Sequence, residues 1–220
     1  MKMNSTIAVL LVEDNPGDVH LFQEMLGQSN STVFDITHVD RLSQALNHLR
    51  EVKFNVVLLD LSLPDSKGLE TFYKVIKEVP TTPIVVLSGL DDEDTTIKSV
   101  EDGAQDYLVK GQIDKQNLIR SIKYAIERNK KEAKQFDKKV EEALELLKKL
   151  KITDREKEIL SLMAEGRTNY EIAKDLFLSI STVRNHIGKI FTKLRISNRA
   201  QATSVAIEAG LLKQSPIEQV

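Results

Sequence analysis

Side chains suited to phosphoryl chemistry stand at the ends of short apolar runs in the first half of the chain. Glu13 and Asp14 follow one run, Asp60 ends a second, Ser88 follows a third, and Lys110 follows a fourth. Crowded carboxylates repel one another, and Mg²⁺, which prefers oxygen ligands, would relieve that repulsion. A carboxylate can attack a phosphoryl group, while Mg²⁺ and a lysine ammonium neutralise the charge on the transferred oxygens.

The apolar runs predict five strands, and residues at helical spacing between them predict five helices. The predicted strands are 6–12, 33–39, 55–60, 83–87 and 106–109, and the helices are 17–27, 42–49, 69–76, 95–100 and a last one from about 114. This alternation favours a doubly wound parallel sheet covered on both faces, whose carboxyl strand ends share one edge. Taken singly, each polar residue is explained as a loop charge or cap, but the joint pattern favours one site.

Charge is distributed unevenly along the chain, whose formal net charge is -2. Residues 1–127 carry 12 basic against 20 acidic side chains, residues 128–151 carry 9 against 5, and residues 152–220 carry 10 against 8. An acidic first half and a mildly basic second half indicate modules with different partners. Cysteine is absent, which excludes disulfides and thiolate chemistry. No apolar run approaches the ~18 residues that span a membrane, so we expect a cytoplasmic protein without a membrane partner.

A second pattern links the two halves. Apolar or small residues recur at alternating spacings of three and four, which is an a/d heptad seam. The predicted seam comprises Ile122, Ile126, Asn129, Ala133, Phe136, Val140, Ala143, Leu147 and Leu150. Because neither Gly nor Pro occurs between Gly111 and Gly166, we expect one helix to run on to about Leu150. A parallel coiled-coil homodimer is the favoured interpretation, and a charged single helix or flexible tether is the alternative.

The sequence pattern of residues 152–220 predicts four short helices, which include a helix-turn-helix. Thr153 and Glu156 form a capping-box pattern, and polar residues share the free face of the third helix. Arg and Asn can read base edges in a major groove, whereas Lys mainly contacts phosphate. A small bundle with a solvated basic face is the alternative. The candidate DNA-binding residues are Thr182, Arg184, Asn185, Lys189 and Lys193.

Residues 6–127 resemble the receiver domain of two-component response regulators. The resemblance is carried by Glu13-Asp14, the run LLDLSLPDSKG, Ser88-Gly89 and the segment 107–110. It implies Asp60 as phosphoacceptor from a histidine kinase and Lys110 as the cation that pairs with the phosphate. It also implies Mg²⁺ held by Glu13, Asp14, Asp60 and the backbone of Ser62, with Ser88 and Tyr107 as a switch pair. Gly111 departs from the family, which usually has Pro there, so we expect no cis bond.

Residues 152–212 resemble the LuxR/NarL-type DNA-binding domain. The run ITDREKEILSLMAEGRTNYEIAKDLFLSISTVRNHIGKIFTKL carries the resemblance, with RISNRAQA after it. It implies that 184–189 lie in the major groove of double-stranded DNA, that Lys193 lies on the DNA backbone, and that 201–207 form a dimer surface. Gly188 departs from the family, which often has a larger polar residue there.

Together these observations predict an α/β five-stranded receiver (1–127), a long helical linker (128–151) and an all-α helix-turn-helix domain (152–220). The predicted function is a transcription factor in which phosphorylation of Asp60 switches dimer geometry and DNA binding. We expect no enzyme activity beyond Mg²⁺-dependent self-phosphorylation and slow dephosphorylation. Two alternatives are a DNA-binding dimer that is independent of phosphorylation and a phosphotransferase or phosphatase. The absence of a GxxxxGK[ST] loop argues against nucleotide hydrolysis.

Overall fold

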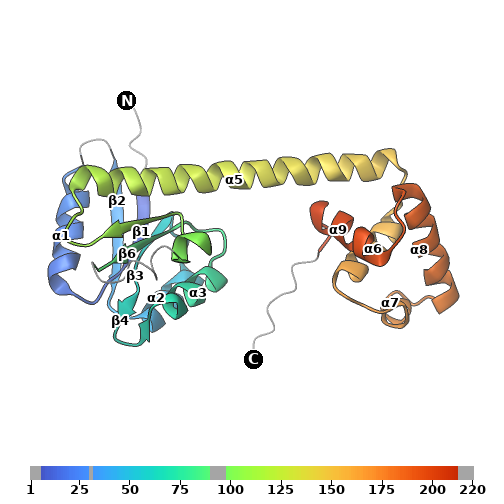
Figure 1. Ribbon diagram of the computed structural model, residues 1–220, viewed down its shortest axis with the longest axis horizontal. Coiled ribbons are helices and arrows are strands. Elements are labelled where there is room, and N and C mark those ends of the chain that lie inside the picture. Colours follow the sequence, from blue (N-terminus) through green and yellow to red (C-terminus); the bar gives the residue numbers. More distant parts are fainter. Residues whose placement is uncertain (1–5, 30–31, 90–97, 213–220) are drawn as a thin grey trace. The chain divides into compact units, whose positions relative to one another are not determined.

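The computed structural model describes residues 6–29, 32–89 and 98–212 of the chain (Figure 1). It divides into two compact units at Glu132 and Ala133, a division that falls inside the predicted linker. Within the part of the chain that is described, no helix is both long enough and apolar enough to cross a membrane.

The first unit is built on five parallel strands in the order β2-β1-β3-β6-β7. They are β1 (Thr6–Val12), β2 (Val33–Val39), β3 (Val56–Asp60), β6 (Ile84–Ser88) and β7 (Asp106–Val109). The strand order reverses direction beside β1, which is where doubly wound sheets open a crevice at the carboxyl ends of their strands. The predicted parallel sheet is therefore confirmed.

Alternate residues of the central strands pack into two cores, one on each face of the sheet. Leu10 and Val12 face one core, whereas Val9 and Leu11 face the other. Helices α2 (Leu42–Glu51) and α3 (Leu69–Glu78) cover the first core, and α1 (Pro16–Gly27) and α5 (Lys115–Lys149) cover the second. This burial on both faces explains why the strands are uniformly apolar in sequence. The predicted helix 95–100 lies partly outside the described residues, which begin again as a helix at residue 98.

The loop after β3 contains a small hairpin that the sequence did not predict, formed by β4 (Ser62–Leu63) and β5 (Ser66–Lys67). Its tip places Asp65 at the start of α2, where its carboxylate accepts the backbone N–H groups of Leu42 and Ser43 at 2.8 and 2.9 Å. The residue at the N-cap position, Arg41, makes no side-chain capping bond. Asp65 therefore caps α2 from a distant part of the chain.

Helix α5 is continuous from Lys115 to Lys149, as predicted, and contributes to both units. Its seam positions have different surroundings along its length. Ile122 and Ile126 are buried in the core of the first unit, and Leu147 is buried in the second. The expectation that these three face a partner chain is wrong, because the same three-four spacing also describes a helix packed onto its own core.

The middle of the seam is more exposed. Asn129 donates its side-chain amide to the carbonyl of Thr81 at 2.8 Å, which ties α5 to the first unit. Ala133 is exposed and Phe136 leaves 62% of its surface in solvent. The part of the seam available to a partner is therefore short and centred on Phe136.

The second unit consists of α6 (Asp154–Ala164), α7 (Asn169–Asp175), α8 (Ile180–Leu194) and α9 (Arg199–Glu208). Thr153 and Thr168 head capping boxes, while Ser179 and Asn198 cap α8 and α9. The end of α5 completes the core of this unit through Leu147, with Ala143, Leu144 and Leu150 packed against it. A short helical domain thus gains apolar contacts that its own four helices do not supply.

Candidate functional site

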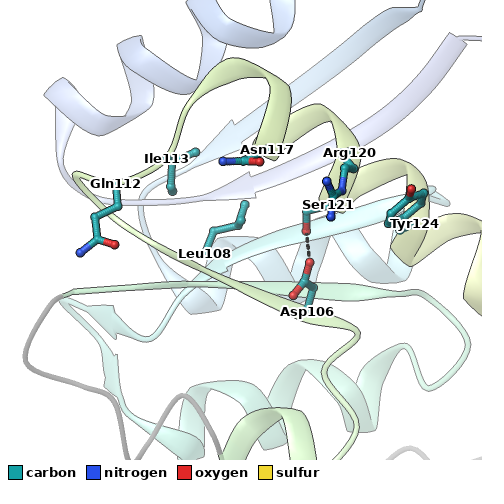
Figure 2. Close-up of a pocket in the computed structure, with 8 residues that line it drawn as sticks. All are labelled: Asp106, Leu108, Gln112, Ile113, Asn117, Arg120, Ser121 and Tyr124. Carbon is teal, nitrogen blue, oxygen red and sulfur yellow. Dashed lines mark hydrogen bonds between the residues drawn. The ribbon is translucent and has the colours of Figure 1, made fainter.

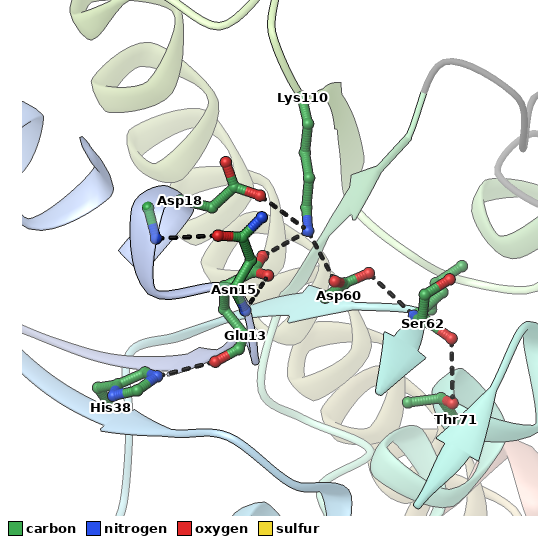
Figure 3. A network of polar contacts seen from close by, with 10 residues as sticks. Glu13, Asn15, Asp18, His38, Asp60, Ser62, Thr71 and Lys110 are labelled. Carbon is green, nitrogen blue, oxygen red and sulfur yellow. Dashed lines mark hydrogen bonds and ion pairs between the residues drawn. The ribbon is translucent and has the colours of Figure 1, made fainter. Parts of the chain in front are cut away.

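The carboxyl ends of β1, β3 and β7 bring three predicted site residues into direct contact (Figure 3). The ammonium of Lys110 lies 2.6 Å from Asp60 Oδ2 and 2.6 Å from Glu13 Oε2. Glu13 and Asp60 are buried, and Lys110 is largely shielded. The strand ends therefore converge as the sequence indicated, and the basic group balances charge that burial would otherwise destabilise.

The carboxylate oxygens form a set suited to a hard divalent cation. One oxygen each from Glu13, Asp14 and Asp60 lies within 4.8 Å of the others, and Asp14 is exposed to solvent. The backbone N–H of Ser62 donates to Asp60 Oδ1 at 2.9 Å, which orients the Asp60 carboxylate. Because Mg²⁺ takes oxygen ligands and keeps several waters, a donor set with one exposed carboxylate fits that ion.

Burial is the largest single influence on the pKa values of Glu13 and Lys110 in this cluster. It raises the pKa of Glu13 to about 7, against the opposing influence of the Lys110 ammonium. Burial also disfavours the charge on Lys110, but the hydrogen bonds to Asp60 and Glu13 outweigh it and raise the pKa of the lysine. Lys110 therefore remains a cation at the site under neutral conditions.

The two predicted switch residues lie on neighbouring strands. Ser88 is buried at the end of β6, and its carbonyl accepts the backbone N–H of Lys110 at 2.7 Å. Tyr107 in β7 pairs with Val86 and leaves 41% of its surface exposed. The peptide bond after Lys110 is trans, and Gly111 adopts a positive φ of 81°, which suits glycine.

Three residues in contact with this charged cluster were not singled out from the sequence. Asp18, in the first turn of α1, lies 3.4 Å from the Lys110 ammonium. Asn15 caps α1 by accepting from Gly17 N and donates its own N–H to Glu13. His38 shares a hydrogen bond of 2.8 Å with the carbonyl of Glu13. Asn15 stands directly before Pro16 at the start of α1, a pattern that could have indicated an N-cap. Nothing in the local pattern of Asp18 or His38 indicated contact with Lys110 or Glu13.

A separate hollow of about 220 Å³ lies between β7 and α5 (Figure 2). Ser121 donates to Asp106 there at 2.7 Å, and Arg120 lies over the ring of Tyr124. None of the predicted phosphoryl-site residues lines it.

Helix α8 in the second unit exposes one polar face. Arg184, Asn185 and Lys189 are exposed there, and within the described chain their side chains make no hydrogen bond or ion pair. Thr182 is partly buried, and its hydroxyl is hydrogen-bonded to Ser179 at 2.8 Å. The opposite face packs into the core through Val183 and Ile190 together with partly buried neighbours. The Arg184, Asn185 and Lys189 side chains are therefore available to an external partner.

Gly188 lies on the same exposed face. A Cβ added at this position would meet no atom within 4 Å. The glycine therefore leaves open space on this face, and no neighbouring atom requires its small size.

Lys193 does not have the predicted role. Its ammonium donates to both carboxylate oxygens of Glu156, at 2.8 and 2.6 Å, and to the carbonyl of Lys151 at 2.7 Å. Glu156 is almost fully buried and also caps Thr153 N. Lys193 thus compensates a buried charge and ties α8 to α6 and to the segment that joins α5 to α6, so its donors are not free for a phosphate.

Comparison with protein families gives two matches in this chain. The model of the response regulator receiver domain matches residues 9–123. The model of bacterial regulatory proteins of the luxR family matches residues 150–206. The first covers most of the unit that contains the Glu13, Asp14 and Asp60 cluster, and the second covers α6 to α8 and most of α9.

Two relatives from Bacillus subtilis (strain 168) show the similarity along the chain. The uncharacterized transcriptional regulatory protein YhcZ is 30% identical over 201 residues, which cover 88% of this chain and 94% of the relative. The transcriptional regulatory protein LiaR is 34% identical over 167 residues, covering 71% and 76%. The full-length FixJ structure from B. japonicum has a TM-score of 0.54 at 20% identity, covers 94% of this chain and 98% of its own, and shows similarity of fold.

Proposed function

The chain belongs to the response regulators that carry a luxR-type DNA-binding domain, and we propose that phosphorylation of Asp60 by a sensor histidine kinase controls its regulation of transcription. A receiver domain implies a histidine kinase as partner, and a luxR-type domain implies binding to DNA. The proposed division is receiver 1–127, linker 128–151 and DNA-binding domain 152–220.

In the proposed reaction, an Asp60 carboxylate oxygen bonds to phosphorus while the bond from phosphorus to the kinase histidine nitrogen breaks. Glu13, Asp14, Asp60 and the backbone of Ser62 would hold Mg²⁺, which supplies positive charge to the transferred oxygens. Lys110 pairs with one of those oxygens. The contact of Lys110 with Asp60 in the described structure supports this assignment.

Ser88 and Tyr107 are the proposed readout of the new phosphoryl group. The Ser88 hydroxyl would donate a hydrogen bond to a phosphoryl oxygen, and Tyr107 would repack into the space behind it. The exposed position of Tyr107 and the buried position of Ser88 on adjacent strands support this pairing. The charge added at Asp60 would thereby favour one of two conformations of the outer surface of β7.

The same site would support two slow reactions without a kinase. A small phosphodonor could phosphorylate Asp60, and water could later release phosphate by attack on the acyl phosphate. Both reactions use the Asp60 and Lys110 groups already named. They are self-modification of a regulator, not turnover of a separate substrate.

The proposed DNA-reading residues are Arg184, Asn185 and Lys189, with Thr182 at the start of α8. Arg and Asn would contact base edges, and Lys189 would contact a phosphate. The exposure of the first three residues on one face supports this assignment. Lys193 is left out because its ammonium is engaged within the chain.

A homodimer is proposed as the state that binds two DNA half-sites. The exposed part of the α5 seam around Phe136 and the outer face of α9, within 201–207, are the candidate contacts. Phosphorylation would change the geometry of this dimer. The exposure of Phe136 and of Gln201, Ser204 and Ile207 supports these surfaces.

The observation that carries the proposal is the presence, in one chain, of the buried Asp60–Lys110 pair and the unpaired polar face of α8. The test has two parts, both with the full chain. Acetyl phosphate and Mg²⁺ should add one phosphoryl group, detected by mass, and Asp60→Asn should abolish it. DNA sites selected from a random duplex library should bind more tightly after phosphorylation.

The alternative of DNA binding without phosphorylation makes a different prediction. Two results together would refute the proposed control through Asp60. The unsubstituted chain would take up no phosphoryl group, and it would bind selected DNA no more tightly or weakly than Asp60→Asn does. DNA binding would then stand alone as the function. Loss of DNA binding by Arg184→Ala would still assign the recognition surface to α8.

A further inference from the structure

Lys110 lies among the oxygens that the proposed function assigns to Mg²⁺. Its ammonium contacts Glu13 and Asp60, two of the three carboxylates in that set, at 2.6 Å each. Two cations cannot share these oxygens at short distance without strong repulsion. Entry of Mg²⁺ therefore requires the ammonium to move away from at least one of them.

A third carboxylate is placed to receive it. Asp18 Oδ2 lies 3.4 Å from the Lys110 ammonium, and its side chain is 28% exposed. Figure 3 shows Asp18 and Asp60 approaching that ammonium from different sides. Asp18 is not in the set of oxygens that could hold the metal.

The position of Asp18 is fixed by the start of α1. Asn15 accepts a hydrogen bond from Gly17 N at 2.9 Å and donates its backbone N–H to Glu13 Oε1 at 3.1 Å. Pro16 begins the helix and limits its backbone further. The loop that carries Glu13 and Asp14 thus also holds Asp18 at a set distance from them.

We propose that Asp18 is a positioning residue that accepts the Lys110 ammonium when Mg²⁺ enters the carboxylate cluster, and so strengthens metal binding. This proposal rests on the proposed metal site and deepens it. A purely structural role is the competing explanation, because an acidic residue in the first turn stabilises a helix through its dipole. The two explanations differ in whether the effect of Asp18 passes through Lys110.

The test is calorimetric titration of the full chain with Mg²⁺, which requires no phosphorylation or DNA binding. We expect Asp18→Asn to weaken Mg²⁺ binding about three- to tenfold, as for loss of one partly buried ion-pair partner. Asp18→Glu should restore much of the affinity. Glu24→Gln, which removes an exposed charge from the same helix, is the matched control and should change the affinity less than about twofold.

A double-mutant cycle with Lys110→Met separates the two explanations. Lys110→Met alone should tighten Mg²⁺ binding, because the competing cation is gone. Adding Asp18→Asn to that variant should then change the affinity less than about twofold. Thermal unfolding of each variant verifies that the fold is retained.

Two results would overturn the proposal while leaving the metal site intact. One is unchanged Mg²⁺ affinity in Asp18→Asn. The other is an equal loss with and without Lys110→Met, which would show that Asp18 acts only as distant charge or through the helix. Absence of Mg²⁺ binding by the unsubstituted chain would instead refute the proposed metal site, and with it this role of Asp18.

Discussion

Two lysines of this chain pair with buried carboxylates, and their surroundings assign them different tasks. Lys110 lies just beyond the end of β7 and contacts three carboxylates, those of Glu13, Asp18 and Asp60. The Lys193 ammonium donates to the Glu156 carboxylate and to the carbonyl of Lys151, in the segment that joins α5 to α6. The first arrangement can exchange partners with an incoming ion, whereas the second holds helices together.

Removing the Lys193 ammonium should destabilise the second unit. Lys193→Met would leave the buried Glu156 carboxylate without its cation, at a cost of about 3 kcal/mol of unfolding free energy. Chemical denaturation of the full chain, followed by signals from the second unit, measures this. Lys189→Met is the control: it should change stability by less than about 0.5 kcal/mol yet weaken DNA binding. Equal stability of the two variants would contradict the structural role of Lys193.

Glu156 should also make the second unit sensitive to acid. Burial alone would raise its pKa, but the hydrogen bonds from Lys193 and Thr153 outweigh burial and lower the pKa below its ordinary 4.5. A carboxyl whose pKa falls on folding contributes stability above its unfolded pKa and loses it as pH drops through the folded value. The stability difference between the unsubstituted chain and Glu156→Gln should therefore shrink as the pH falls below the ordinary glutamate pKa of 4.5.

Substitutions at Gly188 should increase stability, unlike the substitutions of Lys193 and Glu156. Since a Cβ there meets no neighbour, Gly188→Ala should raise the unfolding free energy by about 0.5–1 kcal/mol, as replacement of a mid-helix glycine does. Gly188→Lys should in addition tighten binding to selected DNA and steepen its salt dependence by about one phosphate contact. Binding isotherms at several salt concentrations measure both. Weaker binding by Gly188→Lys would show that DNA approaches too closely at this position.

At the scale of elements, the site is held by contacts between segments far apart in the chain. The loop that follows Asp60 supplies Ser62 N to its carboxylate and Asp65 to the start of α2. Thr71, in the first turn of α3, donates to Ser66 of this loop at 2.8 Å. Strand β3, which ends at Asp60, is thus joined to α2 and α3 through one short hairpin.

Asp65→Ala should test that connection. Loss of the cap from two N–H groups of α2 should lower the unfolding free energy of the first unit by about 1 kcal/mol. Chemical denaturation measures the change. Asp40→Ala is the matched control, because Asp40 is exposed and its pair with Arg41 is 4.0 Å long. Equal effects of the two substitutions would refute the capping role.

The sequence predicted the elements and strand-end residues well because both depend on local pattern. Buried strands are continuous apolar runs, and parallel strands align their carboxyl ends, so Glu13, Asp60 and Lys110 could be placed together. Asp65 and Asp18 could not be, because their partners are distant in sequence. The spacing of Ile122 and Leu147 also could not reveal whether they face a partner chain or their own core.

At the scale of the whole molecule, the proposed control requires a change in assembly or in its geometry. We expect light scattering of the full chain to show a larger mass, or tighter self-association, with beryllofluoride and Mg²⁺ than without them. Phe136→Asp should weaken that association, because it places a charge at the exposed centre of the α5 seam. Lys139→Asp, on an exposed position of the same helix, is the control. Identical masses for all chains in both conditions would exclude the seam as a dimer contact.

The contribution of α5 to both cores has a consequence for dividing the protein. The luxR-family match begins at residue 150, but Leu147 is buried in the second core, and Val140 lies against Gly210, where an added Cβ would be 3.1 Å from its Cγ1. A fragment that starts at the family boundary would expose the apolar surface that these side chains cover. Cleavage near Glu132 would leave the hydrophobic core of each unit intact. Protease-resistant fragments should therefore end near Glu132 and not near residue 150, where the family match begins.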